Sequence, residues 1–232
     1  MIARRSSQAL TEVVLCSGYP TQLALTGALR LAGLEPLTAD GGVSLAFIAV
    51  LSAADTVLLL GLIAWLLARR GESPSTLLFG GRAQGREAGL GLALAPLVLV
   101  FIPTAIWALR TAWPALGNVP ENPLERLATT PARALVLLAV AMIAGGVREE
   151  VQRAFLVHRF RTDLGGASRG VVLTSIAFGL GHLVQGWDAV VVTALLGAFW
   201  AVLYLRRGSI TAGMTSHALA NGTQIVVAYL RG

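Results

Sequence analysis

Residues 43–68 read VSLAFIAVLSAADTVLLLGLIAWLLA, and Asp55 is the one charged side chain among them. A helix needs about 20 consecutive apolar residues to cross the hydrocarbon core of a bilayer. This stretch is long enough, and Arg69 and Arg70 follow it directly, as is typical where such a helix reaches water. The stretch therefore predicts a membrane-spanning helix.

The composition of the whole chain points the same way. Of its 232 residues, 55% are hydrophobic and only 13% are charged, and the mean hydropathy is +0.71. Soluble domains carry about 25% charged residues. The single cysteine, Cys16, excludes an internal disulfide and a cysteine-based metal site. The composition thus predicts an integral membrane protein rather than a soluble domain.

Further apolar stretches repeat the pattern along the chain, at 89–109, 132–159, 170–184, 189–205 and 210–230. Pro96 and Pro103 predict a kink within the first of these. The N-terminal stretch 9–34 has two interpretations: it spans the membrane, or it is an interfacial or re-entrant helix broken near Gly18 and Pro20. We expect an all-α, polytopic transmembrane bundle of about seven spans (about six to eight) in a single domain, residues 1–232, with the chemistry-bearing motifs within 132–230.

Arginine placement predicts the orientation. All 18 basic residues are arginine, which is typical of a GC-rich genome and indicates a bacterial source. One set of loops is rich in arginine, with Arg4, Arg5, Arg69, Arg70, Arg82, Arg86, Arg159, Arg161, Arg169, Arg206 and Arg207. By the positive-inside rule these loops and the N-terminus are cytoplasmic, in a bacterial cytoplasmic membrane. No basic stripe with interleaved aromatic residues accompanies the net charge of +6, so we expect the bilayer, and no nucleic acid, as a partner.

Three groups of polar residues interrupt the apolar stretches. An ionisable side chain at membrane depth costs roughly 2.5–3.5 kcal/mol on insertion scales and commonly faces a partner or a water-filled cavity. The first group is REEVQR, residues 148–153, where Glu149 and Arg153 lie four residues apart and Glu150 and Arg153 lie three apart, so each pair shares a helix face. The alternative for this group is a helix end that emerges into a solvated cluster of charges.

The other two groups lie on later helices. His182 follows Phe178 by four residues, and its alternative role is structural. His217 and Asn221 share a face of a small-residue helix, for which the alternative is a hydrogen-bonded helix contact. Together the three groups present carboxylates, imidazoles and an amide. A glutamate can activate water, an imidazole can bind a metal or polarise a carbonyl, and an amide can donate to an oxyanion.

In this order on late apolar helices, these motifs resemble the CPBP family of intramembrane proteases, which includes the eukaryotic type II CAAX prenyl endopeptidase and bacterial Abi-type relatives. The resemblance implies an endopeptidase whose site residues are Glu149, Glu150, Arg153, His182, His217 and Asn221. It also implies a divalent metal, preferably zinc, on His182 and His217 and possibly Glu149, or else a glutamate-activated water without metal. The substrate would be a membrane-associated or leader-type peptide or a membrane protein, and a prenylated substrate is not expected in a bacterium.

One feature departs from the family pattern, which is Glu-Glu-x-x-x-Arg. Here one residue fewer separates Glu150 from Arg153. This leaves open which glutamate is the base; we favour Glu149, with Glu150 as an accessory. Two other functions stay open: a non-catalytic scaffold or immunity-type protein with a degraded site, and an ion- or proton-coupled transporter.

Two residues outside the motifs also have predicted roles. Asp55 is expected to pair with an arginine such as Arg148 or to line the substrate cavity. Trp200 is expected in an interfacial belt or in core packing.

Overall fold

The computed structural model describes residues 2–231, with side chains described from residue 5 onward. The predicted domain 1–232 and the side chain of Arg4 extend just beyond this range. Within it the fold consists of helices, and apart from an isolated bridge between Leu37 and Val43 it has no β-structure. The prediction of an all-α fold is confirmed. The α-helices are α1 (Ile2–Leu15), α2 (Tyr19–Leu31), α3 (Leu45–Arg69), α4 (Pro74–Phe79), α5 (Gln84–Ala112), α6 (Pro131–Val140), α7 (Glu149–Asp163), α8 (Ala167–Leu180), α9 (Trp187–Arg207) and α10 (Thr211–Arg231).

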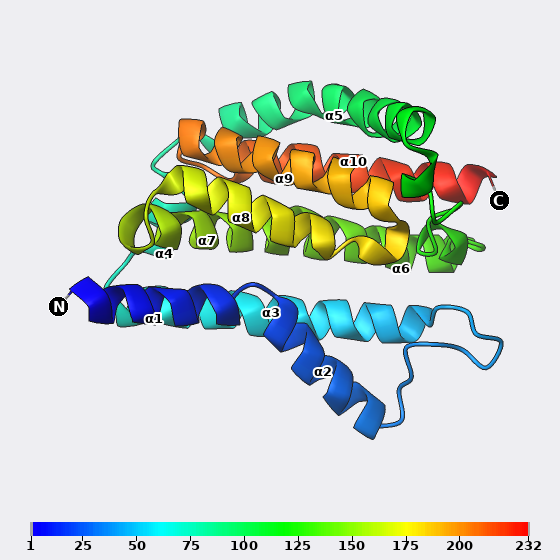
Figure 1. The fold of residues 1–232 in the computed structure, drawn as a ribbon, viewed down its shortest axis with the longest axis horizontal. Helices are drawn as coiled ribbons and strands as arrows, with labels where there is room; N and C mark the ends of the chain where they lie inside the picture. The colour runs from blue at the N-terminus through cyan, green and yellow to red at the C-terminus, as the bar shows by residue number, and fades with distance from the viewer. Residues whose placement is uncertain (1, 232) are drawn as a thin grey trace.

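Three of these helices, α3, α5 and α9, are long and apolar enough to cross a membrane by length and composition. The stretch 43–68 becomes α3, which Ser44 caps by accepting a hydrogen bond from the backbone N–H of Phe47. The stretch around Pro96 and Pro103 becomes α5, which continues through both prolines and arches over the bundle in Figure 1. The number of about seven spans remains a prediction.

The helices pack as a layered bundle along one long axis (Figure 1). The α5 helix lies on one side, α9 and α10 come next, and α8 with α6 and α7 occupy the middle. On the other side lie α1 and α3, while α2 splays away from the bundle. Most of α7 is buried, although its sequence is the most polar of the long helices. Large apolar side chains such as Val57 of α3, Leu97 of α5 and Leu173 of α8 are exposed, which gives the bundle an apolar exterior suited to lipid.

The N-terminal stretch is broken at Gly18, as one of its two interpretations predicted. Gly18 has φ 88°, a left-handed conformation that only glycine adopts without strain, and Pro20 lies in the first turn of α2. The chain therefore forms two short helices, α1 and α2, in place of one long span.

The stretch 132–159 differs from the prediction of one uniform helix. Residues Ala141–Arg148, between α6 and α7, form a π-helix. The helix α10 approaches this segment closely: a Cβ atom on Gly146 would lie 2.5 Å from the Cβ of Ala218. Such wide turns are rare and often occur at functional sites. Here the π-helix directly precedes Glu149.

The helix predicted for the stretch 170–184 ends earlier than expected. The helix α8 ends at Leu180, Gly181 is its C-cap, and a short 3-10 turn follows at Leu183–Gln185. His182 therefore lies just beyond the helix rather than within its last turn.

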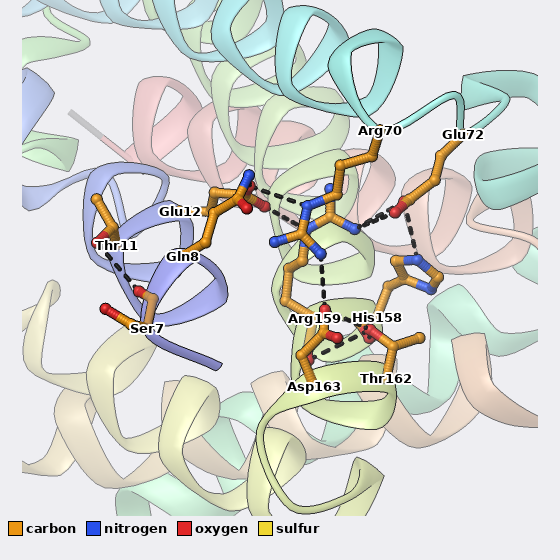
Figure 2. Close-up of polar contacts among 10 residues, drawn as sticks. All are labelled: Ser7, Gln8, Thr11, Glu12, Arg70, Glu72, His158, Arg159, Thr162 and Asp163. Atoms are coloured by element: carbon orange, nitrogen blue, oxygen red, sulfur yellow. Dashed lines mark hydrogen bonds and ion pairs between the residues drawn. The ribbon is translucent and has the colours of Figure 1, made fainter. Parts of the chain in front are cut away.

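A buried ion-pair cluster joins α1, the loop after α3, and α7 (Figure 2). Arg159, with no exposed side-chain surface, donates from Nε to Glu12 (2.6 Å) and from Nη1 to Glu72 (2.7 Å). Arg70 donates to the other oxygen of Glu12 (3.0 Å) and to Asp163 (2.7 Å). Because Glu12 serves two arginines, it attaches α1 to both α7 and the α3–α4 loop.

We expect Glu12→Gln to lower the free energy of unfolding by about 2 kcal/mol, because Arg159 and Arg70 each lose a charged hydrogen-bond partner and keep only Glu72 and Asp163. Arg30→Gln is the control: it breaks a pair with Glu35 in which both side chains are more than half exposed, and should cost less than about 1 kcal/mol. Thermal unfolding in detergent measures both. Equal, small losses would contradict a structural role for the cluster.

Candidate active site

Glu149 and Glu150 start α7, directly after the π-helix, and they have different surroundings. The side chain of Glu150 is 1% exposed, whereas that of Glu149 is 16% exposed. Neighbouring residues on an α-helix point in directions about 100° apart. One carboxylate is therefore enclosed in the bundle, and the other remains accessible.

One carboxylate oxygen of Glu150 has two partners. Its Oε1 accepts hydrogen bonds from Nη1 of Arg153 and from Nδ1 of His217, the latter at 2.9 Å. The guanidinium of Arg153 in turn lies over the rings of Phe178 (4.6 Å) and Trp200 (5.5 Å). Since an ionised carboxylate only accepts hydrogen bonds, the Nδ1 atom of His217 carries the proton. Glu150 thus orients the imidazole ring.

His217 is fixed on its ring face as well as at Nδ1. Its ring stacks on Trp200 with centroids 3.7 Å apart and 15° between the planes. Trp200 is itself fixed by a hydrogen bond from Nε1 to Ser216 (3.1 Å). The remaining nitrogen of His217, Nε2, lies 3.7 Å from Oε2 of Glu149. The arrangement presents an oriented imidazole nitrogen beside the accessible carboxylate.

Close backbone approach permits this packing. A Cβ atom on Gly213 of α10 would lie 2.9 Å from Oε2 of Glu150. A larger residue there would crowd the carboxylate of Glu150, which would have to shift.

His182 lies at the edge of this group. Its Nδ1 donates to the backbone carbonyl of Phe178 (2.9 Å), which leaves Nε2 free. The Phe178 ring lies edge-on to both imidazoles, 4.8 Å from that of His182 and 6.2 Å from that of His217. Phe178 is therefore the contact that connects His182 to the rest of the site.

Asn221 lies one turn after His217 on α10. Its amide Nδ2 donates to the backbone carbonyl of Ala141, at the start of the π-helix, at 3.3 Å. One amide hydrogen is used in this way, and a second remains on the same nitrogen. Asn221 thus ties α10 to the segment that leads into Glu149.

The six predicted residues do not meet as one contact group. Glu149, Glu150, Arg153 and His217 are joined by direct polar contacts. His182 joins through Phe178, and Asn221 through the backbone of α10. Arg153 pairs with Glu150, three residues earlier, rather than with Glu149.

The core-packing alternative for Trp200 is confirmed, since this residue is 2% exposed, and the structure also stacks it on His217. No motif signals this role, because the contact joins α9 to α10. For Asp55 the first of two interpretations is confirmed: it lies 3.1 Å from Nη1 of Arg148.

Two cavities lie beside the contacting residues Glu149, Glu150, Arg153 and His217. One of about 240 Å³, lined mainly by apolar residues of α6, the π-helix and α10, includes Ala218 and Gly222, which flank Asn221 along the helix. A larger one of about 390 Å³ lies near the ion-pair cluster and is lined by Glu72, His158 and Arg161, among others. It contains none of the six predicted residues.

The donor set does not fit a zinc centre. A catalytic zinc commonly takes three protein ligands. Among the described residues, no three His, Cys, Asp or Glu side chains come close enough to hold a metal ion. Nδ1 of His217 is held by Glu150, and Nδ1 of His182 by a backbone carbonyl, so only Nε2 of each imidazole could bind a metal. Metal binding by His182, His217 and Glu149 remains a prediction that this arrangement does not favour.

Comparison with known proteins supports the motif analysis. Residues 131–223 match the family model described as Rce1-like, type II CAAX prenyl endopeptidase Rce1-like. The match runs from α6 into α10 and includes all six predicted residues, and it confirms the resemblance noted in the sequence. Neither the curated proteins nor the solved structures contain a match to the chain.

The unequal burial of the two glutamates predicts unequal effects on stability. Glu150→Gln should lower the free energy of unfolding by about 3 kcal/mol, because it leaves Arg153 buried without its counter-charge. Glu149→Gln should change it by less than about 1 kcal/mol, since its contacts with Arg148 and His217 are long. Thermal unfolding of both variants checks this. A larger loss for Glu149→Gln would reverse the assignment of the buried anchor.

Proposed function

We propose that the chain is an intramembrane endopeptidase, because residues 131–223 match the Rce1-like family model of type II CAAX prenyl endopeptidases. The family is one of proteases. The proposed substrates are membrane-associated or leader-type peptides. One observation supports the activity above all: Glu150 orients His217 so that Nε2 lies 3.7 Å from the accessible carboxylate of Glu149.

In the proposed mechanism, Glu149 is the general base. Its side chain is the more exposed of the two carboxylates, and it does not pair with Arg153. It takes a proton from a water molecule, and the resulting hydroxide attacks the carbonyl carbon of the scissile peptide bond. Glu149 then returns the proton to the leaving amine as the carbon–nitrogen bond breaks.

The other residues stabilise charge and hold geometry. In the doubly protonated form of His217, its Nε2–H and the second amide hydrogen of Asn221 are suitable donors for the developing oxyanion. Glu150 accepts from Nδ1 of His217 and stabilises the imidazolium, as a carboxylate does behind a catalytic histidine. Arg153 neutralises Glu150, so that this buried carboxylate remains ionised. His182, with Nε2 free beside Phe178, is proposed to bind the peptide carbonyl.

The short spacing between Glu150 and Arg153 is the feature that favours a degraded, non-catalytic site. Against that interpretation, the two side chains form a buried ion pair three residues apart. Residues three apart and residues four apart are both neighbours on one face of an α-helix. The missing residue therefore does not remove the Glu–Arg contact, and this supports the enzyme over the scaffold.

Replacement of the proposed base gives the first test of activity. Glu149→Gln should lower kcat about 10²- to 10⁴-fold, the usual contribution of a general base, without loss of folding. Cleavage of a fluorogenic panel of leader-type and membrane-protein peptides in bilayers measures this. Glu121→Gln, an exposed surface change, is the control and should cleave as the parent does. A parent without turnover on any peptide would overturn the proposed function, and an active Glu149→Gln would overturn only the assignment of the base.

Metal dependence gives a second test. Because the donor set does not fit three-ligand coordination, we expect purified protein to retain activity after chelation and to hold less than one zinc ion per chain. Elemental analysis and peptide cleavage before and after chelation measure both. Stoichiometric zinc that is lost in His182→Ala and His217→Ala would instead establish a metal mechanism.

A further inference from the structure

We propose that the buried ion pair between Asp55 of α3 and Arg148 positions Glu149 for the reaction, so that α3 is part of the catalytic apparatus. This inference rests on the proposed function, and it adds two positioning residues that lie outside the six motif residues. Neither of the two touches the reacting atoms in the mechanism above; both act through Glu149.

Asp55 lies at a position where a charge is unfavourable unless it has a partner. It is near the middle of α3, one of the helices apolar and long enough to span a membrane, and it is 1% exposed. Ionisable residues at such depth are costly and commonly functional. The hydroxyl of Thr21 donates to its Oδ1 (2.6 Å), and Gln22 donates to its Oδ2 (3.3 Å). Both carboxylate oxygens are therefore fixed.

Arg148 connects this fixed carboxylate to the site. It is the last residue of the π-helix, and its side chain is 9% exposed. Nη1 lies 3.1 Å from Oδ2 of Asp55 and also donates to Gln152 (3.3 Å), while Nη2 donates to Oε1 of Glu149 (3.5 Å). Gln152 is anchored in turn to the carbonyl of Cys16 (2.9 Å). The guanidinium is thus held at Nη1 by Asp55 and Gln152 and can define where Glu149 points.

The two oxygens of Glu149 are divided between two partners. Oε1 faces Arg148, and Oε2 faces Nε2 of His217 at 3.7 Å. Arg148 thereby selects the side-chain rotamer that directs Oε2 toward the imidazole. Asp55 matters because it shares the charge of Arg148. Without it, the guanidinium would be free to form a full ion pair with Glu149, and a carboxylate in such a pair is a weaker base.

A double-mutant cycle separates positioning from simple stabilisation. Asp55→Asn and Arg148→Gln each leave one buried charge unpaired, so both should lower Tm. The double variant leaves no charge unpaired, so its Tm should recover most of the loss. If the pair were only structural, kcat would recover together with Tm. If Arg148 positions Glu149, kcat of the double variant should remain about 10-fold or more below the parent, with KM little changed, because the base is present but misdirected.

Two controls complete the experiment, which uses the full chain in bilayers with the best peptide of the panel. Arg148→Lys keeps the charge on a shorter group and should restore part of kcat, which neutral side chains should not. Glu87→Gln combined with Arg207→Gln removes an ion pair (2.5 Å) between a buried glutamate of α5 and a partly exposed arginine of α9, and should leave kcat unchanged.

The outcomes are distinguishable. A parent that cleaves, with Glu149→Gln inactive and the Asp55/Arg148 double variant as fast as the parent, would overturn this inference and leave the proposed function intact. A parent without turnover would overturn the proposed function itself. A double variant that regains Tm but not kcat supports the positioning role.

Discussion

The arrangement of this bundle depends on the pairing of charges that α7 carries into its interior. Glu150, Arg153 and Arg159 are each at most 5% exposed, and each has an oppositely charged partner. A lone buried charge would be several kcal/mol unfavourable, so the neighbouring helices must supply counter-charges at the right depth. That requirement brings Glu12 of α1 and Glu72 of the α3–α4 loop to one end of α7. The apolar exterior can then face lipid while the centre stays polar.

At the other end of α7 the same requirement separates the roles of the two glutamates. Glu150 uses Arg153 and His217 to satisfy its charge, and in doing so it fixes the imidazole. Glu149 keeps only long contacts, which leaves it available to water. The π-helix before it and the small residues Gly146 and Gly213 let α10 approach closely enough for His217 to reach this turn. An anchor and a base thus arise from consecutive residues because a helix turns by about 100° between them.

The N-terminal helices contribute more than a hydrophobic cover. The break at Gly18 lets α2 splay away from the bundle (Figure 1), while Thr21 remains hydrogen-bonded to Asp55. Through Asp55 and Arg148, α2 and α3 are connected to Glu149. The part of the chain outside the family match therefore has a physical route by which it can act on the site.

The sequence by itself determined the membrane environment, the all-α class and the approximate limits of α3, α5, α9 and α10. Apolar runs of this length are compatible with few structures other than membrane-spanning helices. It also singled out the motif residues, since charges and imidazoles at membrane depth are expensive. It could not show the π-helix, the end of α8 before His182, or the stacking of Trp200 on His217, because each follows from contact between helices distant in sequence. Likewise the sequence does not show which glutamate pairs with Arg153, because Glu149 and Glu150 both lie within reach of it on a helix. Only the packing of α10 and α3 against α7 decided which carboxylate is enclosed and which is free, because burial and the choice of partner are properties of the assembled bundle.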